Sequence, residues 1–421
     1  MSDESRRYDL VVWGATGFAG RLVAKYLTER YAPDDVSVAI GGRDRDRLEE
    51  FGDELTDRGD GWDAIPVVVG DATEPDTLRG IAKETDVVCT TVGPYTRYGT
   101  PMVDACVEVG TDYCDLTGEV NWIREMVDLY HDDAVDSGAR IVHSCGFDSV
   151  PADLGTLMVQ SFATEEYATA CDSVRVYLEE SSGGASGGTL ASAAELFKAA
   201  SEDPTARRTV RNPYSLAPPG ERDGPDPGEQ TGAKKDTIRS VWTAPSPMAV
   251  VNERVIRRTN ALLEYPWGRE FRCTEVVPTG TGVRGAVTAT AIAGGLGAGK
   301  FAMSLDPIRS GLQRFVFPDP GEGPTRDEIE NGYFTVRVLG RGRTDGGKFT
   351  VEAVIGGDLD PGYGSTARML GEAAMSLVKG DVESPLSGGV LTPASGIGQP
   401  LGDRISDAGM TVEVRGRGEP V

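Results

Sequence analysis

Tyr8–Gly20 reads YDLVVWGATGFAG, in which a run of apolar residues typical of a buried β-strand passes directly into a turn with three glycines. The residues that follow have helical spacing, with apolar side chains at Leu22, Val23, Tyr26 and Leu27. A strand, a glycine turn and a helix together direct backbone N–H groups and the positive end of a helix at one point. This arrangement predicts a binding site for a diphosphate, such as that of a dinucleotide.

The three glycines are spaced G-x-x-G-x-x-G, which differs from the G-x-G-x-x-G of the standard dinucleotide fingerprint. Thr16 stands where the second glycine would be, so Gly17 is expected to be the residue whose backbone comes closest to a ligand. The alternative is a tight turn with close helix packing and no ligand. On the dinucleotide interpretation, the cofactor-binding residues of the turn are Gly14, Ala15, Thr16, Gly17, Phe18 and Gly20.

The end of the next predicted strand indicates which dinucleotide is bound. Val36–Ile40 leads into Gly41-Gly42-Arg43, at the position where an NAD site has a carboxylate for the ribose 2′-hydroxyl. A guanidinium suits a 2′-phosphate, so Arg43 predicts NADP(H). The alternative for Arg43 is a solvated side chain near Asp44. Asp71 follows the third strand and is expected beside the adenine, with capping of the next helix as an equally good interpretation.

The composition is that of a globular protein with a strong acidic excess. The 421 residues carry a formal net charge of -24, which argues against nucleic acids and anionic membranes as partners. The acidic residues are dispersed and arginine far outnumbers lysine, a pattern that predicts halophilic adaptation; an ordinary acidic cytosolic enzyme is the alternative. The polar segment Met1–Arg7 does not resemble a signal peptide, which favours a cytoplasmic protein.

The cysteines and histidines argue against two classes of site. The six cysteines include no C-x-x-C pair and are expected to be buried thiols of a reducing compartment. With only two histidines, His131 and His143, a zinc site is not expected. A G-x-S-x-G elbow is absent from the sequence, which argues against a serine hydrolase.

Predicted strands and helices alternate in the first part of the chain, as is typical of a doubly wound parallel sheet. We therefore expect an α/β fold with a Rossmann-type NADP-binding domain over residues 1–150. Residues 151–385 are expected to form an α+β substrate domain, in which Thr344–Gly347 predicts a β-hairpin. The sequence leaves open how the C-terminal segment 386–421 packs. The strands predicted for the first domain are Tyr8–Trp13, Val36–Ile40, Ile65–Val69, Val87–Val92, Tyr113–Cys114 and Arg140–His143.

Three later stretches each allow more than one interpretation. Asp203–Arg239, rich in Pro, Gly and charge, is expected to be a long surface excursion. Arg254, Arg257 and Arg258 lie at helical spacing, where one could bind an anionic group in the crevice, or all could form a solvated face paired with nearby carboxylates. Gly285–Gly299 is expected to be a strand followed by a glycine loop, with shallow membrane contact as the alternative.

Candidate catalytic residues lie in the loops after the strands, where ligands of open α/β sheets bind. After the fourth strand, Gly93 and Pro94 form a sharp turn close to the expected cofactor, and Tyr95 brings a phenol that could donate a proton. The alternative for Tyr95 is packing on the nicotinamide or shaping the turn. After the last strand of the first domain, Asp148 could position a substrate, or it could cap the helix that begins near Pro151.

Several motifs resemble those of the saccharopine dehydrogenase-like oxidoreductases. They are GATGFAG, GGR, TTVGPY, YCDLTGE and GFDSVPADLG. Two later stretches, PMAVVNERVIRRTNALLEYPWGREFRCTEV and GGVLTPASGIG, resemble the branch called trans-acting enoyl reductases. The resemblance implies an NADP-dependent two-domain reductase that acts on an enoyl double bond of a chain carried by a partner polyketide synthase.

The expected function is hydride transfer from NADPH to a C=C bond of a lipid-related substrate, with C=O and C=N bonds as less favoured acceptors. A non-catalytic NADP(H)-binding sensor or scaffold is the alternative from another class. The expected partner is a small-molecule or carrier-bound lipid-like substrate. Weak membrane association through Gly285–Gly299 and a homodimer are further expectations, and they would place the protein in the cytoplasm or at the periphery of a membrane.

Overall fold

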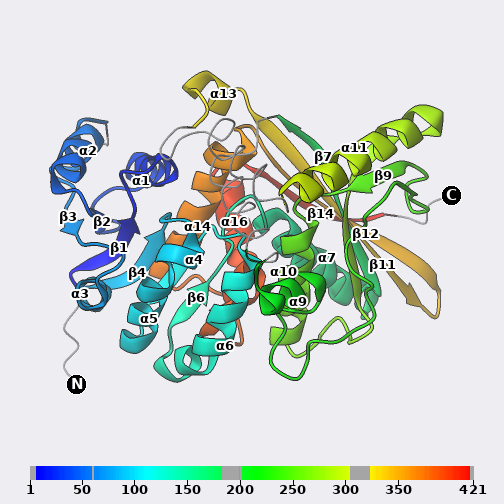
Figure 1. Cartoon of the computed structure of the whole chain (residues 1–421), viewed down its shortest axis with the longest axis horizontal. Helices are drawn as coiled ribbons and strands as arrows, with labels where there is room; N and C mark the ends of the chain where they lie inside the picture. The colour runs from blue at the N-terminus through cyan, green and yellow to red at the C-terminus, as the bar shows by residue number, and fades with distance from the viewer. Residues whose placement is uncertain (1–5, 59–60, 183–198, 200–201, 304–322, 418–421) are drawn as a thin grey trace.

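The computed structural model describes residues 6–58, 61–182, 199, 202–303 and 323–417 (Figure 1). Within these residues the chain forms two seven-stranded sheets, each with helices packed against it. One sheet lies toward the N-terminus in the view of Figure 1 and the other toward the C-terminus. The arrangement confirms the expected α/β fold with a Rossmann-type sheet and a second α+β region.

All strands of the first sheet run parallel, in the order β13-β6-β5-β4-β1-β2-β3. Helices α1, α2 and α14 cover one face, and helices α3, α5 and α6 cover the other. Coverage on both faces explains why these strands are nearly continuous apolar runs. The strands are β1 (Tyr8–Trp13), β2 (Val38–Gly42), β3 (Val67–Val69), β4 (Thr85–Thr90), β5 (Asp112–Asp115), β6 (Arg140–Val142) and β13 (Gly389–Leu391). The helices are α1 (Phe18–Arg30), α2 (Arg45–Arg58), α3 (Pro75–Lys83), α5 (Thr100–Val109), α6 (Val120–Ser137) and α14 (Thr366–Lys379).

The second sheet is mixed, in the order β14-β12-β11-β7-β10-β9-β8. Strands β7 and β10 pair in parallel, and the other neighbours pair antiparallel. The hairpin predicted at Thr344–Gly347 is confirmed as the turn between β11 and β12. Helix α7 (Val150–Tyr167) packs on β11, β12 and β14, and α10 (Ala249–Leu262) packs on β10. The strands are β7 (Ser173–Ser182), β8 (Lys234–Lys235), β9 (Trp242–Pro245), β10 (Arg272–Gly280), β11 (Tyr333–Thr344), β12 (Gly347–Gly357) and β14 (Thr411–Arg417).

The end of the chain contributes to both sheets. Strand β13 extends the first sheet beside β6, and β14 extends the second sheet beside β12. Helix α14 also packs on β1, β4 and β5 of the first sheet. The division into 1–150, 151–385 and 386–421 stays a prediction, but the two sheets are not built from consecutive pieces of chain. The remaining elements are α4 (Tyr95–Tyr98), α9 (Pro204–Arg211), α11 (Gly282–Met303), α13 (Arg326–Glu330), the π-helix η1 (Pro361–Ser365), α15 (Pro393–Gly396) and α16 (Gln399–Asp407).

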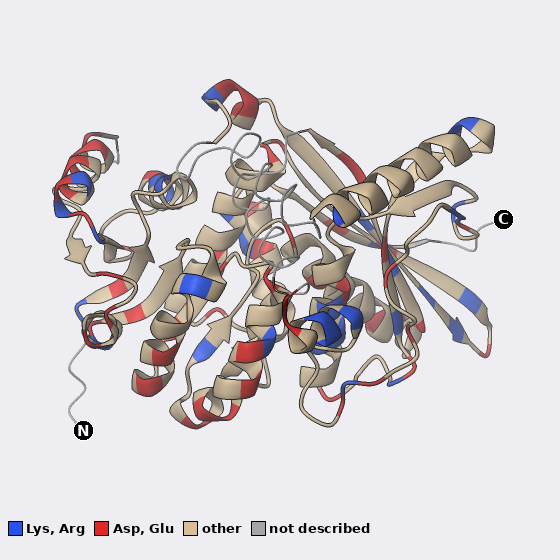
Figure 2. Ribbon diagram, viewed as in Figure 1, with Lys and Arg blue, Asp and Glu red and all other residues tan. Residues whose placement is uncertain are grey.

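The strand and glycine loop expected at 285–299 are wrong, because this stretch lies within the helix α11. Its Gly, Ala and β-branched residues show neither the 3.6-residue period of a helix nor the two-residue period of a strand clearly, so the sequence did not indicate a helix. The helix is held by its first turns, where Gly285 and Ala289 are buried against β9 and β10. Val283, Val287 and Phe301 are exposed, and Figure 2 shows few charged positions along the helix. Among the helices of the described ranges, none is long and apolar enough to cross a membrane.

Candidate functional site

The glycine turn after β1 is shaped by close contacts that leave no room for side chains. Gly14 has φ +87°, and a Cβ there would lie 2.6 Å from Cγ2 of Val92. A Cβ on Gly20 would lie 2.2 Å from the carbonyl oxygen of Gly14, so α1 starts directly against the turn. These contacts match the roles of the first and last glycines in a dinucleotide fingerprint, which are a tight turn and close helix packing.

The N-terminus of α1 is open to a ligand. Gly17 occupies the N-cap position, and among the described residues no side chain caps it. The first turn contains no acidic residue, so the partial positive charge of the helix end is not neutralised locally. A glycine-lined cradle at an uncapped helix end fits the diphosphate of a dinucleotide. The residues present therefore fit the cofactor that the sequence predicts.

Arg43 and Asp71 lie at the carboxyl ends of β2 and β3, beside this cradle. Arg43 is exposed directly after β2. Asp71 accepts hydrogen bonds from the backbone N–H and the hydroxyl of Thr73, at 2.8 and 2.6 Å. These bonds, and to a smaller extent the charge of Arg43, lower the pKa of Asp71. The carboxylate is thus engaged in a local turn, and its contact with adenine stays a prediction.

The loop after β4 is fixed by a carboxylate that the sequence did not point to. Glu119 accepts hydrogen bonds from the backbone N–H groups of Tyr95 and Thr96, both at 2.9 Å, at the start of α4. It thereby holds Gly93 and Pro94 in place beside the glycine turn. Because the two partners lie 24 residues apart, no local motif indicated this contact.

Tyr95 directs its phenol into the first domain. Its side chain is 3% exposed, and its hydroxyl donates to the carbonyl oxygen of Thr90 at 3.1 Å. Burial raises the pKa of Tyr95 well above its ordinary value. The ring packs against Trp122, with centroids 5.3 Å apart. This geometry suits the alternative role, in which Tyr95 shapes the turn, and its role as a proton donor stays a prediction.

A buried cluster joins the loops after β5 and β6. Asp115 contacts Nδ1 of His143 at 2.7 Å and accepts from the hydroxyl of Tyr113 at 3.0 Å. It also accepts from the backbone N–H of Ser144, which has φ +66°. His143 is buried, with 2% of its surface exposed, and its Nε2 has no hydrogen-bond partner among the described residues. The cluster fixes the direction in which the chain leaves β6 toward Asp148.

Asp148 lies where the loop after β5 meets α10, which is the expected place of the crevice between the two sheets. A Cβ added at Gly118 would lie 3.8 Å from Oδ2 of Asp148 and 3.7 Å from Cγ2 of Val251 on α10. The side chain is only half-buried by surface area, yet the surrounding protein is dense enough that desolvation raises the pKa of Asp148 to about 6. A carboxyl group with such a pKa can hold a proton close to neutral pH.

The distinctive sequence motifs meet at Asp153, next to this crevice. The Asp153 carboxylate accepts from the hydroxyl of Thr259 on α10 and from the backbone N–H of Ala394, the latter at 2.9 Å. Thr259 also shares a hydrogen bond of 2.6 Å with Thr392. One buried carboxylate thus joins the GFDSVPADLG motif to the motifs around residues 252–263 and 388–398.

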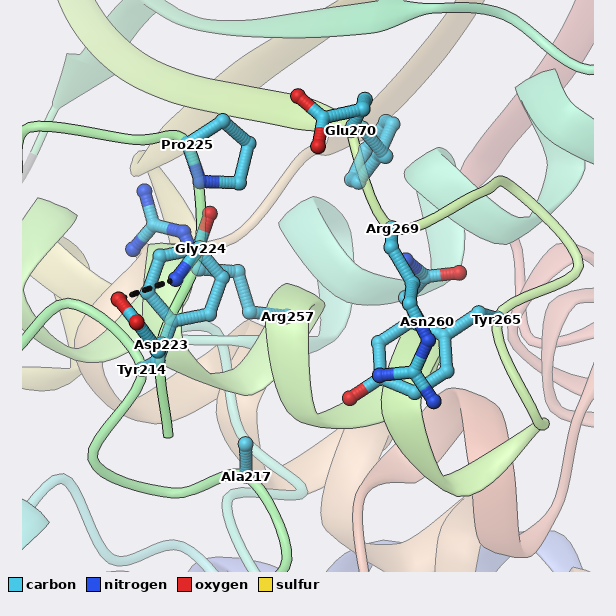
Figure 3. A pocket seen from close by; sticks show the side chains of 11 residues that line it. Tyr214, Ala217, Asp223, Gly224, Pro225, Arg257, Asn260, Tyr265, Arg269 and Glu270 are labelled. Carbon is cyan, nitrogen blue, oxygen red and sulfur yellow. Dashed lines mark hydrogen bonds between the residues drawn. The ribbon is translucent and has the colours of Figure 1, made fainter. Parts of the chain in front are cut away.

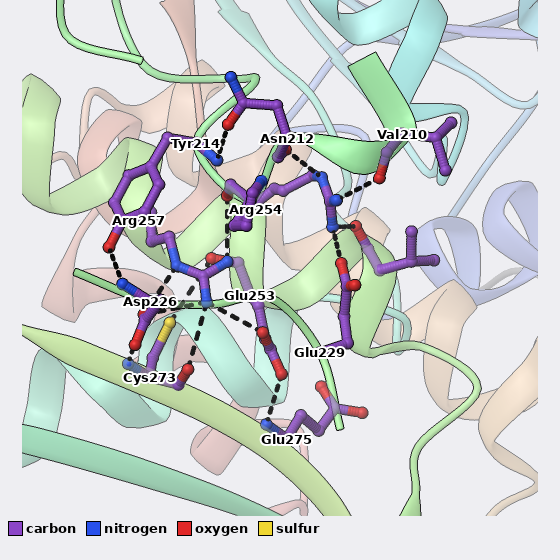
Figure 4. Close-up of polar contacts among 12 residues, drawn as sticks. Val210, Asn212, Tyr214, Asp226, Glu229, Glu253, Arg254, Arg257, Cys273 and Glu275 are labelled. Atoms are coloured by element: carbon purple, nitrogen blue, oxygen red, sulfur yellow. Dashed lines mark hydrogen bonds and ion pairs between the residues drawn. The ribbon is translucent and has the colours of Figure 1, made fainter. Parts of the chain in front are cut away.

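The expected solvated face of Arg254, Arg257 and Arg258 is wrong, because all three are at most 3% exposed, but the expected pairing with nearby carboxylates is confirmed for Arg254 and Arg257. Arg257 contacts Asp226 at 3.0 Å, and Arg254 pairs with Glu229 (Figure 4). Arg258 donates to backbone carbonyl groups on either side of α10. These buried contacts tie residues 203–239 to α10, so that segment is anchored rather than a free excursion. The guanidinium groups are engaged in this way and do not support anion binding in the crevice.

The structure also contains a cavity of about 350 Å³ at the far end of α10 (Figure 3). Tyr214 and Arg257 lie on one side and Tyr265 and Arg269 on the other, with the Arg269 guanidinium 3.9 Å from the centre of the Tyr265 ring. The predicted cofactor and catalytic residues are not among the described residues that line it. The sequence analysis did not foresee this cavity.

Comparison with known proteins bears on the fold and on the site. The family described as the saccharopine dehydrogenase NADP binding domain matches residues 10–142. A Mycobacterium tuberculosis protein (strain H37Rv), classed provisionally as a trans-acting enoyl reductase, is 39% identical over 98% of this chain and 99% of its own. The trans-acting enoyl reductase of Mycobacterium ulcerans is 37% identical with the same coverage.

A solved structure supports the architecture. Apo saccharopine dehydrogenase (L-Glu forming) from Saccharomyces cerevisiae has a TM-score of 0.54 and 14% identity, with 98% of this chain and 100% of that chain covered. At that identity the likeness shows the fold alone.

Proposed function

The chain belongs to the trans-acting enoyl reductases, within the saccharopine dehydrogenase-like oxidoreductases, and we propose that it reduces the enoyl double bond of a lipid-related thioester. It is an NADP-dependent oxidoreductase. The observation that carries the proposal is the uncapped, glycine-lined start of α1 followed by Arg43, which provides for NADPH beside a crevice that contains Asp148.

Bound NADPH supplies a hydride. The N–H of Gly17 already donates to the carbonyl oxygen of Gly14, so the free backbone N–H groups of the first turn of α1, from Phe18 onward, bind the diphosphate. Arg43 binds the 2′-phosphate through charge-assisted hydrogen bonds. The loop Gly93–Thr96, held by Glu119, positions the nicotinamide end. Most of the rate enhancement then comes from holding two reactants in a fixed orientation.

Reduction of a C=C bond also needs a proton, and we assign its donation to Asp148. The Asp148 carboxyl lies at the crevice and is held near its protonated form by burial. When protonated, it can also donate a hydrogen bond that polarises the acceptor. Tyr95 is less well placed, because its hydroxyl is already bonded to Thr90 inside the domain.

The test is turnover of NADPH with crotonyl-CoA as the enoyl thioester, for the wild type, Asp148→Asn and Tyr95→Phe. We expect Asp148→Asn to lower kcat by roughly 100- to 10,000-fold, the usual contribution of a positioned acid. Its Kd for NADPH should not change, and Tyr95→Phe should retain most of the activity. An unchanged kcat in Asp148→Asn would refute its role as the acid.

The same assay separates the other candidate functions. Turnover of ketone or imine acceptors without turnover of enoyl thioesters would identify a C=O or C=N reductase. Tight NADPH binding with no turnover on any of these acceptors would identify a sensor or scaffold. The Tyr95 phenol, which is buried and bonded to Thr90 instead of facing a substrate, is the observation that favours the sensor.

We further propose a carrier-bound substrate, weak membrane contact through α11, a homodimer, a cytoplasmic location and adaptation to high salt. The exposed apolar side chains of α11 support the membrane contact, since helices in water normally carry charge on their outer face. The net charge of -24 supports adaptation to high salt, because salt screens repulsion among like charges.

A further inference from the structure

A second carboxyl group belongs to the second sheet and is connected by two hydrogen bonds to Ser149, the residue after Asp148. Glu275 belongs to β10 and is 3% exposed. Its two carboxyl oxygens accept from the hydroxyl of Ser246 and from Nδ2 of Asn252, the latter at 2.7 Å. Both donors are neutral. The carboxyl group is therefore hydrogen-bonded but not neutralised by these partners.

Asn252 connects this group to the loop that carries Asp148. Its Oδ1 accepts from the hydroxyl of Ser149 at 2.9 Å, while its Nδ2 donates to Glu275. Ser149 and Asn252 are themselves 0% and 5% exposed, so this bridge lies inside the protein. The side-chain amide of Asn252 thus connects the loop that carries Asp148 to β10.

The neighbouring Glu253 has an ion-pair partner, which Glu275 does not have among the described residues, yet burial raises the pKa of Glu253 to about 7 as well. Glu253 pairs with Arg257 at 2.9 Å and accepts from the backbone N–H of Glu275 at 2.9 Å (Figure 4). Among the residues that the structure describes, no Lys or Arg forms an ion pair with Glu275. The charged and titratable groups that face it are Asp148, Glu253 with its partner Arg257, and the thiol of Cys273. A buried carboxylate with no cation of its own is costly unless it keeps its proton.

We propose that Glu275 acts on the reaction through Asp148, and that the two carboxyl groups titrate as one unit that retains a proton at the crevice near neutral pH. Glu275 is a positioning residue in this scheme, since it touches neither substrate nor cofactor. The proposal rests on the proposed function, in which Asp148 is the acid. Each carboxylate disfavours ionisation of the other, as like charges in one site do.

The direction of the pKa shifts agrees with this geometry. Burial, with the charge of Asp148 as a further cause, raises the pKa of Glu275 to about 7. Burial raises the pKa of Asp148 to about 6. The hydrogen bonds from Ser246 and Asn252 act in the opposite direction on Glu275 and do not offset the burial.

The first test needs no turnover. The carbonyl band of protonated carboxyl groups is followed by infrared spectroscopy from pH 4.5 to 8.5 in the wild type, Asp148→Asn and Glu275→Gln. Asp153 and Glu253, whose pKa values burial raises to about 6 and about 7, titrate in the same range, so the pair is followed in difference spectra between the wild type and each variant. We expect the midpoint of Glu275 in Asp148→Asn to lie below its wild-type value by about half a pH unit or more, because a like charge has gone. Glu275→Gln should lower the midpoint of Asp148 in turn, since coupling between two sites is reciprocal.

Glu413→Gln is the matched control, because it makes the same substitution at an exposed position of the same sheet and should leave both midpoints unchanged. Midpoints in Asp148→Asn and Glu275→Gln that equal the wild-type values would overturn the proposal. If Glu275→Gln does not fold, the midpoints of Asp148→Asn alone test the proposal. The half-buried side chain of Asp148 can be replaced without the loss of a buried hydrogen bond.

The second test links the pair to catalysis. The pH profile of kcat with crotonyl-CoA should lose its alkaline limb at a lower pH in Glu275→Gln than in the wild type, and Glu275→Asp should restore part of the difference. A uniform fall of kcat at every pH would mean a structural role and would overturn the proposal. If the infrared midpoints show that the two carboxyl groups are coupled but crotonyl-CoA is not reduced, the proposed function is refuted and the coupling is not.

Discussion

Replacing Gly20 by alanine tests the cofactor cradle most directly. The added methyl carbon would lie 2.2 Å from the carbonyl oxygen of Gly14 and 2.8 Å from Oγ1 of Thr91. Carbon–oxygen contacts in proteins begin near about 3.3 Å, so the start of α1 must move away from the turn by about 1 Å. The N–H groups at the helix end would move with it.

Two effects of known size follow from this displacement. Overpacking of this kind lowers the free energy of unfolding by about 1–3 kcal/mol. A displaced N–H group also loses a charge-assisted hydrogen bond to the diphosphate, worth about 1.5–3 kcal/mol. We therefore expect the Kd for NADPH to rise by about 10- to 100-fold in Gly20→Ala.

The assay is a fluorescence titration with NADPH, combined with urea unfolding of the same variant. Gly80→Ala is the matched control, because Gly80 lies in the exposed helix α3 with nothing within 4 Å of the added methyl group. It should keep the wild-type Kd and gain up to about 1 kcal/mol of stability from better helix propensity. Wild-type affinity and stability in Gly20→Ala would refute the close approach of helix and turn.

Three further variants test other parts of the structure. Arg43→Ala should raise the Kd for NADPH by about 10- to 100-fold and leave the Kd for NADH unchanged, because one charge-assisted contact is lost; equal loss for both dinucleotides in parallel titrations would contradict the assignment. Asp153→Ala should lower the free energy of unfolding in urea by about 2–4 kcal/mol, because Thr259 and the N–H of Ala394 lose a buried acceptor. Burial raises the pKa of Asp153 from 3.8 to about 6. Between these pH values the folded state binds a proton that the unfolded state has lost, so the free energy of unfolding falls as pH rises. This pH dependence of the free energy of unfolding should vanish in Asp153→Ala. Phe301→Glu should change stability by less than about 0.5 kcal/mol, since the side chain is 68% exposed, and should reduce sedimentation with phosphatidylcholine vesicles if α11 contacts lipid.

The sequence predicted the first sheet well because its signals are local. Strand β1 begins and ends at the predicted residues Tyr8 and Trp13, and the alternation of apolar runs with helical patterns indicated parallel pairing. Strand β13 was missed, because three residues joined to β6 across almost 250 positions of chain carry no local signal. Helix α11 was assigned to the wrong class, because its glycines and alanines fit no single period.

The same distinction explains which site residues were found. The glycine turn and Arg43 follow consecutive strands, so their positions could be inferred from the order of elements alone. Glu119 and Glu275 lie in stretches that carry the family resemblance, but they were missed as site residues because a carboxylate in a loop or strand is usually solvated. Their partners come from other loops and elements, and only the folded chain shows them together.

Of the residues in the distinctive motifs, Asp148 is the proposed acid and the others described here hold the structure together. Arg254 and Arg257 of α10 anchor the segment 203–239, and Asp153 joins α7, α10 and the loop after β13. These buried links fix the two sheets relative to each other, and a displacement of about 1 Å between reacting groups can cost about 100-fold in rate. Such residues therefore act on the reaction through geometry. The side chains around Asp148 should then decide the acceptor, and variants there, not at Asp153, are the ones expected to change it.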